Sequence, residues 1–441
     1  MKIAVVGSGI AGLGAAWALS AMHDVTLIEA DPRPGGHSRT LDVDLDGSPV
    51  SVDTGFIVYN ERNYPNLTKL LSTLGASTVD SDMSFAVSLA DGSFEYAGRA
   101  TGLFTNVQSI ADRDVWSVVS GIVRFRNEAA RLRDGSIPDD IDIYTYLMSR
   151  GYTSGFINRY LMPLASAVWS GTRNDVRAMP AESFLRFLDN HGLIRITDRP
   201  QWRTVEGGSR TYVDRIVKEI TRVHTARPVR AVRRSIDGVI VVDASGGTEE
   251  FDHVVLATHA DMTLRLLGEA ATDTERRILS PFHYESNEVV LHTDEAAMPR
   301  RRRVWSSWNA IERDDDDGAR PVSVSYWMNR LQPIETTTDV FVTLNPGDTI
   351  RSDKVLDRWA ATHPQFDVAT QRAQQAVPTI QGADRVWFAG AYLGHGFHED
   401  GLQSGLTVAA ALGAPAPWYN DVVSRSPAAV HAAPQSAGIQ A

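Results

Sequence analysis

The sequence predicts an α/β fold in which a core of parallel strands is interrupted by two long insertions. Three observations predict it. The chain begins with a β-branched apolar run, a glycine-rich turn and a helical stretch, an order typical of a βαβ unit. Apolar runs of the same kind return near the middle and near the end of the 441 residues. The segments between them have a helical pattern from about residue 100 to 200 and alternate strands with loops from 287 to 345.

The elements follow in order along the chain. We expect a first strand over 2–7, a helix over 8–21 and a second strand over 24–30. Amphipathic spacing predicts a helix over 60–76 that stops at a glycine. Residues 239–258 predict a hairpin with a Gly-Gly turn, followed by a buried strand.

The last elements are a buried strand over 385–390 and a helix over 400–413 that Gly413 closes. One nucleotide-binding type of domain, interrupted twice by an α+β domain with an antiparallel sheet, accounts for all of these patterns. The segments of the first domain are 1–75, 200–262 and 378–415, and those of the second are 76–199 and 263–377. We expect the Ala-, Pro- and Ser-rich residues 419–441 to form a disordered tail.

Composition narrows the class of protein. Asp and Glu number 54 against 43 Lys and Arg, so the formal net charge is -11 and nucleic acid is not an expected partner. The absence of cysteine excludes disulfides, thiolate metal sites and a cysteinyl cofactor link. With neither a cleavable leader nor an apolar run long enough to span a bilayer, we expect a cytoplasmic protein. Peripheral contact with a membrane stays open.

The first turn carries a dinucleotide-binding fingerprint. Gly7, Gly9 and Gly12 have the G-x-G-x-x-G spacing between a predicted strand and helix, and Glu29 ends the next strand. In this pattern the glycines permit a tight turn, close approach of a pyrophosphate and close packing of helix and strand. The helix N-terminus attracts the phosphates, and the acidic side chain holds ribose hydroxyls while repelling a 2′-phosphate.

Further blocks resemble a known family. They are GGHSRT (35–40), VDTGF (52–56), RPVRAV (227–232), VVLATHAD (254–261) and VWFAGAYLGHGFHEDGLQSGL (386–406). Their order and content are similar to those of the flavin-containing amine oxidase and phytoene desaturase superfamily, over nearly the whole chain. The resemblance implies a Rossmann-like FAD-binding domain of the glutathione-reductase-like, amine oxidase type, and a non-covalent FAD. The contacts that the fingerprint and the resemblance together predict are Gly7, Gly9, Ile10, Ala11, Gly12, Glu29, Ala30, Gly36, Arg39, Thr40, Thr54, Gly55, Phe56, Val229, Ala257, Thr258, Gly390, Asp400, Gly401 and Leu402.

The stretch HGFHED crowds two histidines and two carboxylates into six residues. In the family that it resembles, a helix begins here with its N-terminus toward the flavin, which leads us to expect the amides of Gly401 and Leu402 to face the cofactor. The helix dipole would stabilise negative charge on the reduced ring. A metal site is the alternative, but no second cluster of ligands at metal spacing occurs elsewhere, and we predict none.

Several motifs resemble one branch of this superfamily, bacterial NAD/FAD-binding oxidoreductases associated with cyclopropane fatty acid synthases. They include AVWSG (167–171), YWMNRLQ (326–332) and GFHEDGL (396–402). That resemblance implies a small hydrophobic or lipid substrate, a fatty acyl chain, and a desaturase-type or dehydrogenase-type oxidation of a C–H bond. The alternatives are a flavin amine oxidase and a non-catalytic FAD-binding partner of a lipid methyltransferase.

Two departures make amine oxidation less favoured. True amine oxidases carry a lysine that holds a water near the flavin, whereas none of the four lysines here, Lys2, Lys69, Lys218 and Lys354, lies in a block that resembles the active site. The family also has a glutamate where this chain has Ala391.

The remaining expectations concern the chemistry of the site. Candidate bases or polar contacts are His398, His395 and Tyr392. We expect aromatic side chains either to line a substrate slot or to fill an ordinary core: Trp305, Trp308, Tyr326, Trp327 and Trp169. Because no second fingerprint lies between a strand and a helix, the predicted electron acceptor is oxygen or an unidentified acceptor.

Overall fold

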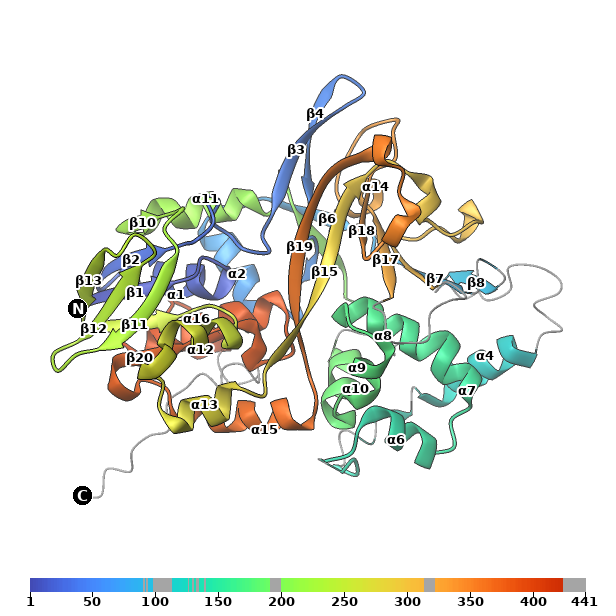
Figure 1. The fold of residues 1–441 in the computed structure, drawn as a ribbon. Coiled ribbons are helices and arrows are strands. Elements are labelled where there is room, and N and C mark those ends of the chain that lie inside the picture. Colours follow the sequence, from blue (N-terminus) through green and yellow to red (C-terminus); the bar gives the residue numbers. More distant parts are fainter. Residues whose placement is uncertain are drawn as a thin grey trace.

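The computed structural model describes residues 1–89, 92, 94–97, 113–125, 127–128, 131, 135–138, 140–190, 200–312 and 322–422. The predicted α/β fold with an interrupted parallel core is confirmed (Figure 1). The amino terminus lies in a five-stranded parallel sheet, in the strand order β10-β2-β1-β14-β20. Its strands are β1 (Lys2–Val6), β2 (Asp24–Ile28), β10 (Arg222–His224), β14 (His253–Leu256) and β20 (Val386–Phe388).

The parallel sheet is buried on both faces, as such sheets require. Along β1, Ile3 and Val5 face one hydrophobic cluster while Ala4 and Val6 face the other. The first cluster takes in α1 (Ile10–Ser20), α2 (Pro65–Thr73), α11 (Arg210–Glu219) and α16 (His398–Ala411). The second takes in the sheet of β11 (Val229–Arg234), β12 (Val239–Asp243) and β13 (Thr248–Phe251), with α12 (Ala260–Leu267), α13 (Asp273–Leu279) and α15 (Val368–Ala376).

A seven-stranded sheet forms the upper right of Figure 1, in the order β19-β15-β18-β17-β16-β7-β8. Its strands are β7 (Phe85–Leu89), β8 (Phe94–Ala97), β15 (His283–His292), β16 (Trp308–Ile311), β17 (Ser323–Trp327), β18 (Phe341–Leu344) and β19 (Val355–Gln365). The predicted antiparallel sheet over 287–345 is confirmed. It is extended by three strands that the sequence did not reveal, and β7 joins it in parallel to β16.

Helices beneath this sheet build a hydrophobic cluster of their own (Figure 1). They are α4 (Arg113–Phe125), α6 (Ile143–Ser149), α7 (Ser154–Phe156), α8 (Met162–Trp169), α9 (Arg173–Ala178) and α10 (Ala181–Asn190). All strands of the parallel sheet come from the segments predicted for the first domain, and all strands of the seven-stranded sheet come from those predicted for the second. Those boundaries themselves stay a prediction.

Smaller elements join the parts. A hairpin of β3 (Thr40–Leu45) and β4 (Ser48–Asp53) rises between the two large sheets (Figure 1). A three-stranded sheet contains β5 (Tyr59–Asn60), β6 (Thr78–Ser81) and β9 (Trp202–Val205). The short helix α14 (Met328–Leu331) follows β17 directly.

Two helices begin elsewhere than the sequence predicted. The helix expected from residue 60 starts at Pro65, because Tyr59 and Asn60 pair with β9 as a strand. The helix expected from residue 400 starts at His398. The first four residues of the expected tail form α17 (Tyr419–Val422), and its residues 423–441 lie outside the described part of the chain.

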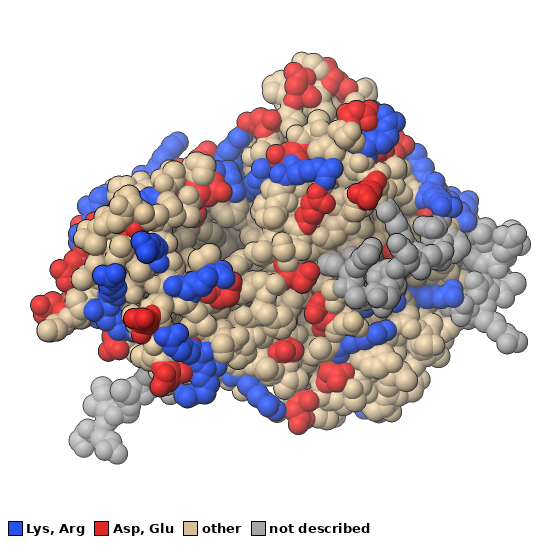
Figure 2. All heavy atoms as spheres, viewed as in Figure 1, with Lys and Arg blue, Asp and Glu red and all other residues tan. Residues whose placement is uncertain are grey.

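The described helices include none that is both long and apolar enough to cross a bilayer. On the face shown in Figure 2, Lys and Arg side chains are interspersed with Asp and Glu, so neither charge forms a continuous field there.

Candidate functional site

A cavity of about 540 Å³ lies where the loops after β1, β14 and β20 meet the seven-stranded sheet. Ligand sites of α/β proteins form in this position, at the carboxyl ends of parallel strands. One end of the cavity is lined by glycine-rich loops of the parallel-sheet domain, which we call the loop end. The other is lined by strands of the seven-stranded sheet and by helices α8 and α10, which we call the chamber.

The glycines of the first turn have different roles. A Cβ atom built on Gly12 would lie 1.9 Å from the carbonyl oxygen of Gly7, and Gly7 itself has a positive φ. Gly9 differs, because a Cβ built there meets no atom within 4 Å and its φ is -61°. Packing therefore explains Gly12, whereas Gly9 borders open space. Because α1 has no side-chain cap and no acidic residue in its first turn, its amino end is suited to an anion.

Glu29 stands at the end of β2, as predicted, and lines the loop end. Its Oε2 accepts hydrogen bonds from the backbone N–H and the hydroxyl of Ser8, at 2.7 and 2.6 Å, and its Oε1 accepts from the N–H of Asp31. These bonds fix the carboxylate beside the glycine turn, where it retains lone pairs for a further donor.

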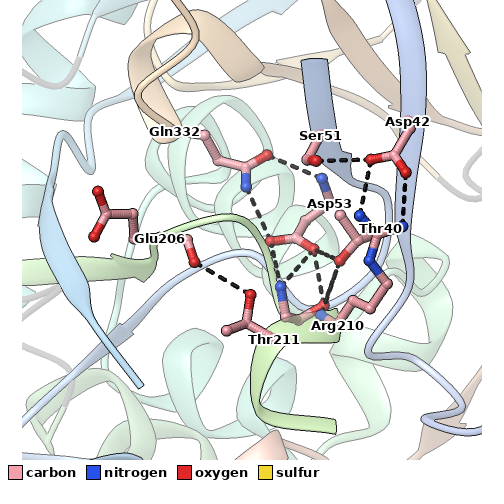
Figure 3. A network of polar contacts seen from close by, with 9 residues as sticks. Thr40, Asp42, Ser51, Asp53, Glu206, Arg210, Thr211 and Gln332 are labelled. Carbon is pink, nitrogen blue, oxygen red and sulfur yellow. Dashed lines mark hydrogen bonds and ion pairs between the residues drawn. The ribbon is translucent and has the colours of Figure 1, made fainter. Parts of the chain in front are cut away.

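The segment Thr54–Phe56 borders the cavity and directly follows Asp53, whose buried carboxylate is the centre of a polar network (Figure 3). The carboxylate accepts hydrogen bonds from Thr40 Oγ1 at 2.6 Å, from the N–H and hydroxyl of Ser209, and from Gln332 Nε2 at 3.0 Å. Burial raises the pKa of Asp53 to about 6, against these hydrogen bonds, which lower it. Asp53 thus ties the β3–β4 hairpin to α11 and to the end of α14.

The start of α16 corrects one expectation. Because the helix begins at His398, the N–H of Gly401 is already bonded to the carbonyl of Phe397 at 3.1 Å. Gly401 lines the cavity, but its amide is not available to a cofactor, and Leu402 lies one residue further into the helix. A Cβ at Gly401 would lie 2.9 Å from Cγ2 of Ile10, so packing against α1 also requires a small residue.

The two carboxylates of HGFHED each have a structural partner. Asp400 accepts from the N–H groups of His395 and Phe397, both at 3.0 Å, and so caps its own helix. Glu399 accepts from Asn66 and Leu67 at the start of α2. No group of three or more His, Asp or Glu side chains in the described segments is placed to hold a metal ion.

The three predicted catalytic candidates all line the cavity, with different environments. The ring of His398 stacks on Phe56, with centroids 3.8 Å apart, and its Nε2 lies 2.7 Å from the hydroxyl of Tyr212. Burial lowers the pKa of His398 to about 3, so the ring is neutral at physiological pH. Nε2 of His395 and the hydroxyl of Tyr392 are buried, with no hydrogen-bond partner among the described residues.

The predicted cofactor contacts divide into two groups. Those that line the cavity are Gly7, Gly9, Ile10, Ala11, Glu29, Gly36, Thr54, Gly55, Phe56, Ala257, Thr258, Gly390 and Gly401. Those that do not line it are Gly12, Ala30, Arg39, Thr40, Val229, Asp400 and Leu402. Arg39 instead pairs with Asp357 at 2.9 Å and lies over the ring of Trp359, linking the GGHSRT segment to β19.

The chamber is apolar and aromatic. Its lining includes Phe85, Leu164, Trp169, Phe187, Val289, Trp308, Tyr326, Val342, Trp359 and Ala361. Of the aromatic residues expected either in a substrate slot or in an ordinary core, Trp308, Tyr326 and Trp169 line the cavity. Trp305 and Trp327 instead pack with Phe341 and Met298 in a separate cluster.

The cavity has almost no charge. Glu29, at the loop end, is the only carboxylate among the described lining residues, and none of these is Lys or Arg. All four lysines lie in described segments, and Lys354 is in a short turn at Ser352–Lys354, away from the lining.

Three histidines of the cavity were missed as functional candidates: His37, His259 and His363. The rings of His37 and His363 lie 5.2 Å apart. Burial lowers the pKa of each, to about 4 for His363, so all three are neutral. A weak signal existed for His363, which follows Trp359 and Ala361 at strand spacing in β19.

Buried polar atoms without a partner gather around this cavity. Such atoms are uncommon in proteins unless a ligand or water completes them. Those whose residues line the cavity, and that have no partner among the described residues, are His37 Nε2, Trp169 Nε1, Trp308 Nε1, Trp359 Nε1, Tyr392 Oη and His395 Nε2. Together with the open space at Gly9, they fit an elongated bound group that extends from the loop end toward the chamber.

Comparisons with known proteins agree with this geometry. The family model of flavin-containing amine oxidoreductases matches residues 10–413. The chain is similar in fold to a putrescine oxidase bound to putrescine (TM-score 0.69, 15% identity, covering 94% of this chain and 99% of that chain). It is also similar to a putative protoporphyrinogen oxidase from Exiguobacterium sp. 255-15 (0.65, 17%, 93% and 98%). A third similar structure is a CLA-producing fatty acid isomerase from P. acnes (0.63, 15%, 91% and 96%). No curated protein sequence matches the chain.

Proposed function

The chain belongs to the family of flavin-containing amine oxidoreductases and is an FAD-dependent oxidoreductase, and we propose that it oxidises a C–H bond of an uncharged, lipid-like carbon chain. The expectations of a flavin enzyme and of FAD are confirmed. The fatty acyl substrate, the desaturase-type or dehydrogenase-type reaction and the association with cyclopropane fatty acid synthases belong to the proposal.

The absence of charge from the described lining of the chamber carries this proposal. An ammonium ion that enters an apolar cavity loses its hydration, at a cost of several kcal/mol unless a carboxylate compensates it. Glu29, at the opposite end, is the only carboxylate in the described lining. An alkyl chain, in contrast, gains about 0.8 kcal/mol for each methylene buried against such a surface. Because putrescine oxidase and fatty acid isomerase share the fold, the fold does not choose between these substrates.

We assign the cofactor to the loop end. Gly9 and the amino end of α1 bind the pyrophosphate, and Glu29 binds the ribose hydroxyls. The other proposed contacts are the predicted residues that line the cavity together with Gly12, which lets α1 approach β1. Ala30, Arg39, Thr40, Val229, Asp400 and Leu402 act, in this proposal, by holding the loops in place. The FAD is bound non-covalently, in a chain without cysteine.

FAD, when bound, supplies the hydride acceptor for oxidation of a substrate carbon. The protein binds and orients the chain and excludes water. His395 is the best placed of the proposed bases or polar contacts, because its Nε2 is unpartnered and buried at the cavity wall. His398 is held by Tyr212 and stacked on Phe56, which suits a positioning role. Tyr392 offers an unpartnered hydroxyl.

Two other functions remain as alternatives in this proposal. The family name favours an amine oxidase, and the fold of putrescine oxidase is compatible with it. A non-catalytic FAD-binding partner of a lipid methyltransferase would need the cofactor site but no substrate chemistry. For a catalytic role, oxygen is the proposed electron acceptor.

Anaerobic reduction of the bound flavin separates these functions. The holoenzyme is mixed without oxygen with fatty acyl esters of graded chain length and, separately, with alkylamines and diamines of matched length. Bleaching of the flavin band by the esters alone supports the proposal. Bleaching by amines alone establishes the amine oxidase, and reduction by dithionite but by no organic compound establishes the non-catalytic protein.

A further inference from the structure

The hydrogen bonds around His363 fix which of its ring nitrogens carries the proton. Asn287 Nδ2 lies 3.0 Å from Nδ1 of His363 and also donates to the carbonyl of Glu285. The orientation of that amide is fixed in turn: Asn345 Oδ1 accepts from the N–H of Glu288 at 3.1 Å, so Asn345 Nδ2 donates to Asn287 Oδ1 at 2.6 Å. An amide nitrogen can only donate, so Nδ1 of the neutral ring accepts and the proton resides on Nε2.

This imidazole lies where the chamber meets the loop end. His363, Ala361 and Trp359 alternate along β19 and all line the cavity. His363 is half-buried, and its ring approaches that of His37 in the GGHSRT segment. With Nδ1 held by Asn287, the Nε2 edge is the one left to a ligand.

The unpartnered tryptophan nitrogens at the cavity wall are also donors. Nε1 of Trp169, Trp308 and Trp359 is in each case buried at the cavity wall, with no partner among the described residues. An indole nitrogen donates and cannot accept. A wall of unpaired N–H groups without a carboxylate is complementary to an oxygen acceptor and repels a ligand whose polar group is itself a donor.

We propose that His363 is a substrate-binding residue whose Nε2–H donates a hydrogen bond to a carbonyl oxygen of an uncharged chain lying in the chamber, with Asn287 as the positioning residue that fixes its tautomer. This inference rests on the proposed function and deepens it. It names the polar group of the substrate, a carbonyl of an ester, thioester or ketone, and places it next to the loop end.

The first test reads the tautomer directly in the holoenzyme labelled with nitrogen-15 in its histidines. Two-bond correlations distinguish a protonated ring nitrogen from an unprotonated one, and the spectrum of His363→Gln assigns the signals. We expect Nδ1 of His363 to be unprotonated and Nε2 protonated at neutral pH. A protonated Nδ1 overturns the inference whatever the variants below do.

The second test measures binding by tryptophan fluorescence, without any turnover. Three probes share an eight-carbon chain and differ in their polar end. Methyl octanoate carries a carbonyl acceptor, octyl chloride a weakly polar end and octylammonium a cationic donor. His363→Phe should weaken the binding of methyl octanoate about fivefold to tenfold, which corresponds to the loss of one neutral hydrogen bond. The affinity for octyl chloride should stay unchanged. His363→Gln, which keeps an amide N–H near the position of Nε2, should restore most of the loss.

The outcomes separate this inference from the proposed function. The inference is contradicted if His363→Phe loses affinity equally for methyl octanoate and octyl chloride, or if octylammonium binds as tightly as the ester. Either result contradicts it even if esters reduce the flavin. A changed FAD affinity in His363→Phe with unchanged probe ratios would assign His363 to the cofactor instead, and also overturns it. If the tautomer and the probe ratios are as expected but no ester bleaches the flavin, the proposed reaction fails while the binding role stands.

Discussion

Glu399, the second residue of α16, accepts a hydrogen bond from the side chain of Asn66, the second residue of α2, at 2.8 Å. The same carboxylate accepts the backbone N–H groups of Asn66 and Leu67, at 2.8 and 3.0 Å. It therefore caps α2 from a neighbouring helix, since α2 has no side-chain cap of its own. The HGFHED motif resembles a metal or acid/base cluster in the sequence, but its Glu399 joins two helices beside the cavity.

This buried carboxylate predicts a pH dependence of stability. Burial raises the pKa of Glu399 from 4.5 to about 7, against the hydrogen bonds, which lower it. Between these values the native state keeps a proton that the unfolded chain has lost. The free energy of unfolding should therefore fall as pH rises from about 4.5 to about 7, by up to about 3 kcal/mol for this group. Glu399→Gln should remove that component in urea denaturation across the window. The exposed Glu288→Gln should keep it, and an unchanged slope in Glu399→Gln would contradict the assignment.

The network in Figure 3 predicts a contrast between two aspartates of one hairpin. Asp53→Ala leaves the donors of Thr40, Ser209 and Gln332 buried without an acceptor, so we expect a loss of about 2–4 kcal/mol in the free energy of unfolding. Asp42→Ala breaks an exposed ion pair with Arg210 and an exposed hydrogen bond from the hydroxyl of Ser51, and should cost less than about 1 kcal/mol. Thermal and urea denaturation measure both losses. If the two variants lose equal stability, the Asp53 network does not join the hairpin to α11 and α14.

Gly9 allows cofactor binding to be separated from folding. Because its φ is -61° and a Cβ meets nothing within 4 Å, Gly9→Ala should leave the stability of the FAD-free protein unchanged. The added methyl group should still weaken FAD binding at least about tenfold, or about 1.4 kcal/mol, because it stands where a pyrophosphate approaches the backbone. Gly12→Ala, in contrast, collides with the carbonyl of Gly7 and should destabilise the FAD-free protein itself. Calorimetric titration with FAD and thermal unfolding read the two effects. Full FAD affinity in Gly9→Ala would place the pyrophosphate elsewhere.

Neighbouring positions of β19 test the chamber. Ala361 is buried against the cavity, whereas Ala360 is exposed on the other face of the same strand. Ala361→Phe should fill part of the chamber and weaken the binding of long chains by about 1–3 kcal/mol, which raises KM about fivefold to 150-fold, with FAD content unchanged. Ala360→Phe should leave KM as it is. If both variants behave alike, the chamber is not where the chain binds.

The cofactor end was predictable because its signals are local. Gly7, Gly9, Gly12 and Glu29 lie within one βαβ unit, where spacing alone places them together. The chamber was not predictable in this way. His37 and His363 meet only because β19 pairs with β15 in a sheet on the far side of the cavity, and no motif joins residues so distant in sequence.

The errors have equally local causes. Trp327 and Tyr326 are adjacent in β17, so they face opposite sides of the sheet, and only one of them can line the chamber. The sequence left both residues open between a substrate slot and an ordinary core, and the alternation places Tyr326 at the cavity and Trp327 in a core cluster. The amide of Gly401 was misassigned because the capping role of Asp400 moves the start of α16 to His398.

The absorption spectrum of the purified protein, recorded before and after acid precipitation, tests the central claim most directly. The account predicts flavin bands that pass entirely into the supernatant, where the released compound is FAD, in a ratio of about one per chain. A protein that stays colourless even after incubation with FAD would contradict the assignment of the loop end. Flavin that stays in the precipitate would contradict non-covalent binding.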